Sequence, residues 1–131
     1  MLKIGQLKPG DIIQVDDEGV MREGIVVKTD HPENLALVDN GVQEFWYGPE
    51  QMHPLPVNDE QLMKFGFTKE DVDGAVKYKK DSFRLVTAKK GDFSHIEMWW
   101  REDRRHFDFQ LGVHELQNLH HDMTKVPLER P

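Results

Sequence analysis

The sequence predicts an α+β protein, in which a small SH3-like β barrel precedes a four-stranded antiparallel meander with a C-terminal helix packed on it. Three observations predict this architecture. Short apolar runs broken by glycine dominate residues 1–52, alternation of apolar and polar residues marks residues 76–111, and apolar residues recur at helical steps from Val113. A chain of 131 residues suffices for one ordinary domain or for two very small ones.

The composition is that of a folded protein outside the secreted and membrane classes. Hydrophobic residues make up 37% of the chain and charged residues 31%, which is far from the composition of disordered proteins. The sequence has neither a long apolar run nor a leader of the secretory type. The absence of cysteine excludes disulfides, thiolate zinc sites and cysteine nucleophiles. We therefore expect a cytoplasmic protein without a membrane partner.

The net charge of −7 is unevenly distributed along the chain. Residues 1–60 hold four basic against twelve acidic residues, a net charge of −8, whereas residues 61–131 hold thirteen against twelve, a net charge of +1. A protein that binds duplex nucleic acid needs uncompensated lysine and arginine side chains to displace counterions from the phosphates. Binding of duplex nucleic acid through the first half is therefore disfavoured.

The expected barrel occupies residues 1–52. A turn at 7–11 opens it, an acidic turn at 16–19 separates its first two strands, and Asn40-Gly41 favours a tight hairpin because both residues adopt positive φ readily. The expected strands cover residues 12–15, 20–28, 35–38 and 42–47.

Residues 53–67 are expected to join the two parts through a proline-rich stretch and a short helix. A residue that precedes proline is restricted to extended conformations, so the prolines interrupt the strand pattern. Asn58 is a suitable N-cap for a helix over 59–65, and Gly66 suits the left-handed residue that ends it.

Residues 68–131 are expected to form the antiparallel sheet and the helix that covers it. The strands are predicted at 76–80, 83–88, 94–101 and 106–111, and the helix at 113–123. A strand period of two places one set of large side chains on a common, buried face. These are Tyr78, Phe83, Leu85, Ile96, Met98, Trp100, Phe107, Phe109 and Leu111.

Adjacent tryptophans in a strand must point to opposite faces, and this gives the candidate binding site. If Trp100 is buried, Trp99 lies on the polar face among cationic and imidazole side chains. An indole can stack on a planar ring while guanidinium groups bind phosphate or carboxylate. The alternative is structural packing of Trp99 against the front part or a second subunit. The predicted ligand-binding residues are Arg84, His95, Trp99, Arg101, Arg104 and His106.

Two stretches of the sequence resemble a known group of proteins. They are Glu60-Gln61-Leu62-Met63-Lys64-Phe65-Gly66-Phe67 after Pro54-Leu55-Pro56, and the closing Val113-His114-Glu115-Leu116-Gln117-Asn118-Leu119. Together they are similar to a family of small uncharacterised proteins of Bacteroides-type phages, prophages and mobile elements. The resemblance spans residues 54–119 and implies a phage protein inside a bacterial host cell. The resemblance concerns origin and architecture, and it implies nothing about chemistry.

Neither a metal site nor a catalytic site is predicted. His114, Asn118 and His121 share one helix face, but asparagine stands where a metalloprotease helix needs its second histidine. We expect His114, His120 and His121 to pack. A carboxylate–histidine pair for acid–base chemistry could come from Asp108 with His95 or His106 across strands. No nucleophile or phosphate-loop motif accompanies that pair.

These observations favour a non-enzymatic accessory protein that acts by binding, without a cofactor, and that forms a homo-oligomer. The expected partner is a nucleotide-like small molecule or a host protein, and the expected effect is interference with host defence. Two alternatives stay open. One is a small nucleotide or phosphodiester hydrolase, and the other is a module that binds single-stranded nucleic acid through Trp99 and lysine hairpins.

Overall fold

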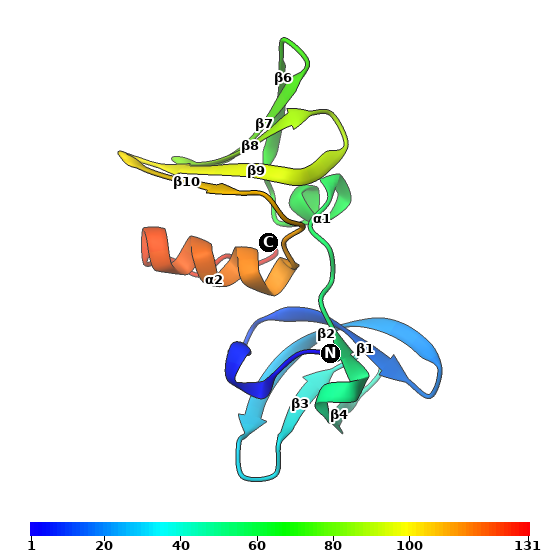
Figure 1. Cartoon of the computed structure of the whole chain (residues 1–131). Coiled ribbons are helices and arrows are strands. Elements are labelled where there is room, and N and C mark those ends of the chain that lie inside the picture. Colours follow the sequence, from blue (N-terminus) through cyan, green and yellow to red (C-terminus); the bar gives the residue numbers. More distant parts are fainter. The chain divides into compact units, whose positions relative to one another are not determined.

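The computed structural model describes residues 1–131 and divides into two compact units, each with its own antiparallel sheet (Figure 1). The first unit comprises residues 1–55 with 112–114, and the second comprises residues 56–111 with 115–131. Two α-helices accompany the two sheets, so the predicted α+β class is confirmed. Neither helix has the length and apolar character needed to cross a lipid bilayer.

The first unit contains a five-stranded antiparallel sheet with the strand order β4-β3-β2-β1-β5, in which β1 to β4 form a meander and β5 pairs with β1. Two 3₁₀ turns, η1 and η2, accompany these strands, one before β1 and one before β5. The elements are η1 (Ile4–Gln6), β1 (Ile12–Asp17), β2 (Val20–Asp30), β3 (Leu35–Asp39), β4 (Glu44–Tyr47), η2 (Pro49–Gln51) and β5 (Met52–His53).

The turn between β1 and β2 follows from its acidic sequence. Glu18 and Gly19 both have positive φ, 52° and 87°, which is the backbone of a type I′ hairpin. The Asp16 carboxylate accepts a hydrogen bond from the Gly19 amide at 2.8 Å and fixes the turn. The predicted turn at 16–19 is therefore confirmed.

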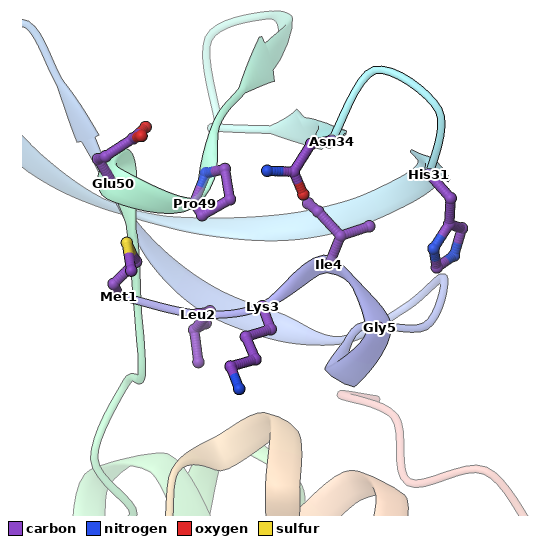
Figure 2. A pocket seen from close by; sticks show the side chains of 9 residues that line it. All are labelled: Met1, Leu2, Lys3, Ile4, Gly5, His31, Asn34, Pro49 and Glu50. Carbon is purple, nitrogen blue, oxygen red and sulfur yellow. The ribbon is translucent and has the colours of Figure 1, made fainter.

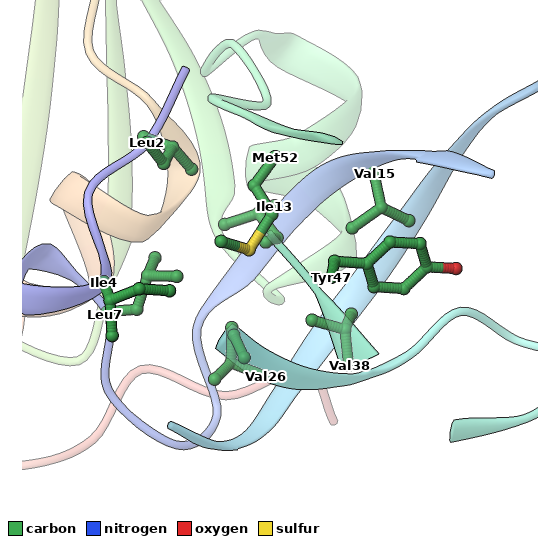
Figure 3. Close-up of a cluster of buried hydrophobic side chains, with 10 residues drawn as sticks. Leu2, Ile4, Leu7, Ile13, Val15, Val26, Val38, Tyr47 and Met52 are labelled. Atoms are coloured by element: carbon green, nitrogen blue, oxygen red, sulfur yellow. The ribbon is translucent and has the colours of Figure 1, made fainter. Parts of the chain in front are cut away.

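The core of the first unit gathers apolar side chains from η1 and its neighbourhood, from the strands and from β5 (Figure 3). Strand alternation places Ile13 and Val15 on the same side of β1, where both are fully buried. The other members are Leu2, Ile4, Leu7, Val26, Ala36, Val38, Tyr47 and Met52.

One expectation for the first unit is not confirmed, and another needs correction. Strands β4 and β5 form the two ends of the strand order and do not pair, so the SH3-like barrel is not confirmed. The loop after β3 has four residues rather than a tight two-residue turn. Buried Asn40 explains its length, because its side-chain oxygen accepts from the amides of Val42 and Gln43 and its side-chain nitrogen donates to the Tyr47 hydroxyl.

The second unit begins with the short helix α1 (Asp59–Lys64). As predicted, Asn58 is its N-cap and accepts a hydrogen bond from the Gln61 amide at 2.9 Å. Gly66 follows with a φ of 87°, in the left-handed region that favours glycine after a helix. Tyr78 donates a 2.7 Å hydrogen bond to Asp59 and so ties α1 to the sheet.

The second sheet has five strands in sequence order, so the predicted count of four is wrong. The additional strand, β6, is exposed along its whole length and carries charged residues, which conceals the apolar alternation used to find strands. The strands are β6 (Thr68–Val72), β7 (Ala75–Lys80), β8 (Phe83–Lys89), β9 (Asp92–Trp100) and β10 (Asp103–Phe107).

The inner face of this sheet, defined by Leu85 and Met98, is covered by helix α2 (Val113–Thr124) as predicted (Figure 1). Phe83 contacts the His120 ring of α2 at 4.7 Å between centroids. Most side chains predicted for this face are buried, namely Tyr78, Phe83, Leu85, Ile96, Met98 and Leu111.

The aromatic residues at the end of the predicted buried face differ from expectation. Trp100 and Phe107 are only half-buried, and Phe109 is 53% exposed. The reason is that β10 runs over Asp103–Phe107 rather than over 106–111, so the chain leaves the sheet before Phe109. Alternation therefore no longer constrains the direction of that side chain.

His120 provides a pH-dependent contribution to stability. Burial lowers the pKa of His120, and the ring nitrogen Nδ1 donates to the Val126 carbonyl at 2.8 Å. The unfolded chain therefore binds more protons than the folded protein as the pH falls below about 6.5, the ordinary pKa of histidine. Stability is fully present above that value and decreases below it. The charged neighbours are Lys80, Asp81 and His121.

We expect His120→Gln to flatten the dependence of the free energy of unfolding on pH between about 5 and 7. Glutamine retains a donor for the Val126 carbonyl but does not titrate. Urea denaturation at several pH values measures the slope, and the exposed neighbour variant His121→Gln is the control. An unchanged slope in His120→Gln would contradict the assignment.

Candidate functional site

The outer face of the second sheet, defined here by Arg84, Trp99 and Arg104, lies opposite the face that α2 covers. Antiparallel register places Arg84 of β8 and Arg104 of β10 on either side of Trp99 of β9. Lys79 of β7 pairs with Arg84 and extends the row. Pairing across strands therefore produces a cationic row around one indole.

A shallow depression of about 320 Å³ lies at this row and is lined by Ser82, Arg84, Trp99, Arg101 and Arg104. None of its three guanidinium groups forms an ion pair with a carboxylate. In a protein with 24 acidic and 17 basic residues, three arginines without carboxylate partners around one depression form a local excess of positive charge. This excess makes the depression a candidate site for an anion.

Trp99 is half-buried, and its ring already has cationic partners. The Arg104 guanidinium lies 4.5 Å from the ring centroid and the Lys77 ammonium 6.0 Å from it. The indole Nε1–H donates to Glu97 at 3.2 Å. A planar ligand must therefore displace Arg104 or stack on its guanidinium, which is a more restricted arrangement than the free indole expected from the sequence.

The turn after β9 separates the arginines that follow the tryptophans. Arg101 has a φ of 56°, and its guanidinium lies over Trp100 at 5.1 Å while its side chain still lines the depression. Arg105 lies opposite Met98 and therefore points to the inner face. There it binds Asp103 at 3.1 Å and Asp122 of α2 at 3.0 Å, so it is a structural residue.

The two predicted histidines form a separate cluster on the same outer face. The Asp108 carboxylate oxygen Oδ1 accepts from His95 Nδ1 at 2.9 Å and from His106 Nε2 at 2.5 Å. These hydrogen bonds, first that from His95 and then that from His106, hold the pKa of Asp108 below its ordinary value. Asp108 thus contacts His95 of the neighbouring strand and His106, which lies two residues earlier in its own segment.

The predicted site residues therefore divide into two neighbouring groups. Arg84, Trp99, Arg101 and Arg104 line the depression, whereas His95 and His106 converge on Asp108. Glu97 lies between the groups, because it accepts from Trp99 and lies 3.8 Å from His106 Nδ1.

The site also contains residues that were not predicted as ligand contacts. Alternation places Lys77 and Glu97 on the outer face, where register brings them to the site, and Asp108 directly follows β10. Ser82 lies in the turn between β7 and β8, where alternation gives no direction.

A second depression, of about 430 Å³, lies in the first unit beside η1 (Figure 2). His31 and Glu50 are among its lining residues, and Figure 2 shows them at opposite ends. Its titratable side chains do not converge on one point, so we place the candidate site on the second sheet.

Comparisons with protein-family models, with curated proteins and with solved structures found no match to this chain.

Proposed function

We propose that the protein binds an anionic small molecule that carries phosphate groups, through the depression at Arg84, Arg101 and Arg104. The single observation that carries this proposal is the absence of carboxylate partners for these three guanidinium groups in an otherwise acidic protein. Guanidinium groups hold phosphate oxygens through paired, charge-assisted hydrogen bonds.

The contacts of Trp99 favour recognition of the phosphate over recognition of a base. Arg104 and Lys77 lie against the indole, and its N–H group binds Glu97. A ring attached to the phosphate can stack on the guanidinium of Arg104, which adds a smaller contribution to the affinity of the ligand. We therefore propose a nucleotide-like ligand whose phosphate groups provide most of the binding affinity.

We also propose that this binding serves a phage or mobile element inside its host cell. The helix α2 contains the Val113–Leu119 motif on which the resemblance to small phage and mobile-element proteins rests. A protein of this kind could interfere with host defence by capturing a nucleotide-like signal, and docking on a host protein is the other route. Self-association into a homo-oligomer remains a prediction that size-exclusion chromatography with light scattering can test.

We expect inorganic pyrophosphate to bind the protein, and Arg84→Ala or Arg104→Ala to weaken this binding at least tenfold. Each substitution removes charge-assisted hydrogen bonds worth about 1.5 to 3 kcal/mol, and a factor of ten corresponds to about 1.4 kcal/mol. Isothermal titration calorimetry at low ionic strength measures the affinity. Quenching of tryptophan fluorescence provides a second signal.

Matched controls separate a specific site from general attraction. Arg22 of the first unit is paired with Asp17 at 3.2 Å, so Arg22→Ala removes the same charge elsewhere and should leave pyrophosphate affinity unchanged. Adenosine should bind far more weakly than adenosine monophosphate. Equal affinity of wild type and Arg84→Ala would refute the proposed phosphate site and favour docking on a host protein.

A second candidate function, hydrolysis of a phosphodiester, is favoured by one observation. Asp108 contacts both His95 and His106, and a carboxylate beside an imidazole supplies a general base or acid. Turnover of bis(p-nitrophenyl) phosphate that disappears in His106→Ala and in Asp108→Ala would support this function. If the protein turned over none of a panel of phosphodiesters, binding would remain the only proposed function.

We also propose that the first sheet is an open relative of SH3-like barrels. Its short strand β5 follows a 3₁₀ turn and pairs with β1, and β2 changes register between Val26 and Lys28. A register irregularity of this kind bends a strand, so that it can belong to two layers. A homologous structure with β4 and β5 in contact would support the assignment.

A further inference from the structure

We propose that His95, His106 and Asp108 bind a divalent metal ion of the zinc type on the outer face of the second sheet. The ligand atoms of these three residues lie within 4.8 Å of one another. The inference concerns metal binding by these residues and is independent of the proposed phosphate site.

The backbone register brings the three residues together. His106 pairs with Glu97 and Phe107 with Ile96, and Asp108 directly follows this last pair, where its carboxylate reaches His95. His106 and Asp108 are two residues apart and therefore project from the same face. The three potential ligands thus come from β9, from β10 and from the residue that directly follows β10.

The side-chain atoms converge on one point in space. A single oxygen of Asp108 accepts from both imidazoles, from Nδ1 of His95 and from Nε2 of His106. Tetrahedral zinc with ligand bonds of about 2.0 to 2.2 Å holds its ligand atoms about 3.3 Å apart. Small rotamer changes of these exposed side chains are sufficient to open the cluster around an ion.

Glu97 lies near one of the histidines and can become its orienting partner when an ion is bound. If Nε2 of His106 binds the ion, the ring proton resides on Nδ1, which lies 3.8 Å from the Glu97 carboxylate. Carboxylates in this position fix the tautomer and the orientation of metal-bound histidines. Glu97 is itself held by the Trp99 indole at 3.2 Å.

The donor set selects the class of metal. Two imidazoles and one carboxylate suit zinc and the neighbouring late transition metals, whereas calcium and magnesium prefer oxygen ligands alone. Three protein ligands leave at least one coordination position for water or an anion. We therefore expect zinc binding with an exchangeable position, and no comparable affinity for magnesium.

Titration of the protein with zinc chloride in phosphate-free buffer tests the proposal. We expect one bound zinc ion per chain and a higher melting temperature. His95→Gln and His106→Gln should each weaken zinc binding at least tenfold, and Asp108→Asn should do the same. Glu97→Gln should weaken it about tenfold, since it removes the orienting carboxylate. The control is His121→Gln on the exposed side of α2.

Long-range ¹H–¹⁵N spectra of the imidazoles identify the coordinating nitrogens, with zinc expected on Nδ1 of His95 and Nε2 of His106. The side chains of His95, His106 and Asp108 are more than half exposed and that of Glu97 is 48% exposed, so the variants should fold like the wild type, which circular dichroism checks. No zinc binding by the wild type would overturn the proposal. Undiminished binding by His95→Gln and His106→Gln would also overturn it, because the ion would then lie elsewhere.

Discussion

Leu85→Ala is expected to lower the free energy of unfolding by about 2 to 5 kcal/mol. Leu85 is fully buried on the inner face of β8, the central strand of the second sheet. It lies between Tyr78 of β7 and Met98 of β9, which are also buried. Truncation of Leu85 removes apolar contacts and leaves a cavity. The surrounding side chains belong to three paired strands and cannot move far enough to fill it.

Urea denaturation followed by circular dichroism measures this loss. Val72→Ala provides the matched control, because Val72 is 42% exposed at the end of edge strand β6. Its truncation should change the free energy of unfolding by less than about 0.5 kcal/mol. If both variants were equally stable, Leu85 would not belong to the core described for the inner face.

Gly24→Ala is expected to destabilise the first unit by about 1 to 3 kcal/mol, although it adds only one methyl group. A Cβ atom at Gly24 would overlap Cγ1 of Val38 and would lie 3.3 Å from the Asp39 carbonyl oxygen. Val38 is fully buried and β-branched, so its side chain has few rotamers available to move away. The backbone of β3 would have to shift.

Gly5→Ala is the control for this substitution. Gly5 does not have a positive φ, and no atom lies within 4 Å of the position that its Cβ would take. Chemical denaturation of both variants, followed by circular dichroism, compares them directly. A Gly24→Ala protein as stable as Gly5→Ala would show that β2 and β3 separate more easily than their packing indicates.

Local sequence signals predicted the parts of the fold that require a particular residue type. The cap at Asn58 and the left-handed Gly66 were found because each requires a particular residue type. Strand β6 was missed because its side chains are all exposed and its stability comes from pairing with β7. The loop at Asn40 was misjudged because burial of its side chain beside Tyr47 decides its length.

The sequence predicts which face of the second sheet carries the candidate site, but it does not predict the contacts that the side chains make there. Alternation correctly separates Trp99 from Trp100, because neighbouring strand residues must point to opposite sides. It cannot show that Arg104 covers the indole or that Arg101 turns toward Trp100. Those contacts depend on cross-strand register and on the positive φ of Arg101, which is uncommon for that residue type.

The edge strands of the second sheet carry charged residues, which affects how the protein self-associates at high concentration. Edge strand β6 carries Lys69, Glu70 and Asp71, and edge strand β10 begins with Asp103, Arg104 and Arg105. Charged side chains on an edge discourage the addition of a strand from another molecule. We therefore expect this sheet to resist growth into amyloid-like fibrils, even though its outermost strands expose unpaired backbone groups.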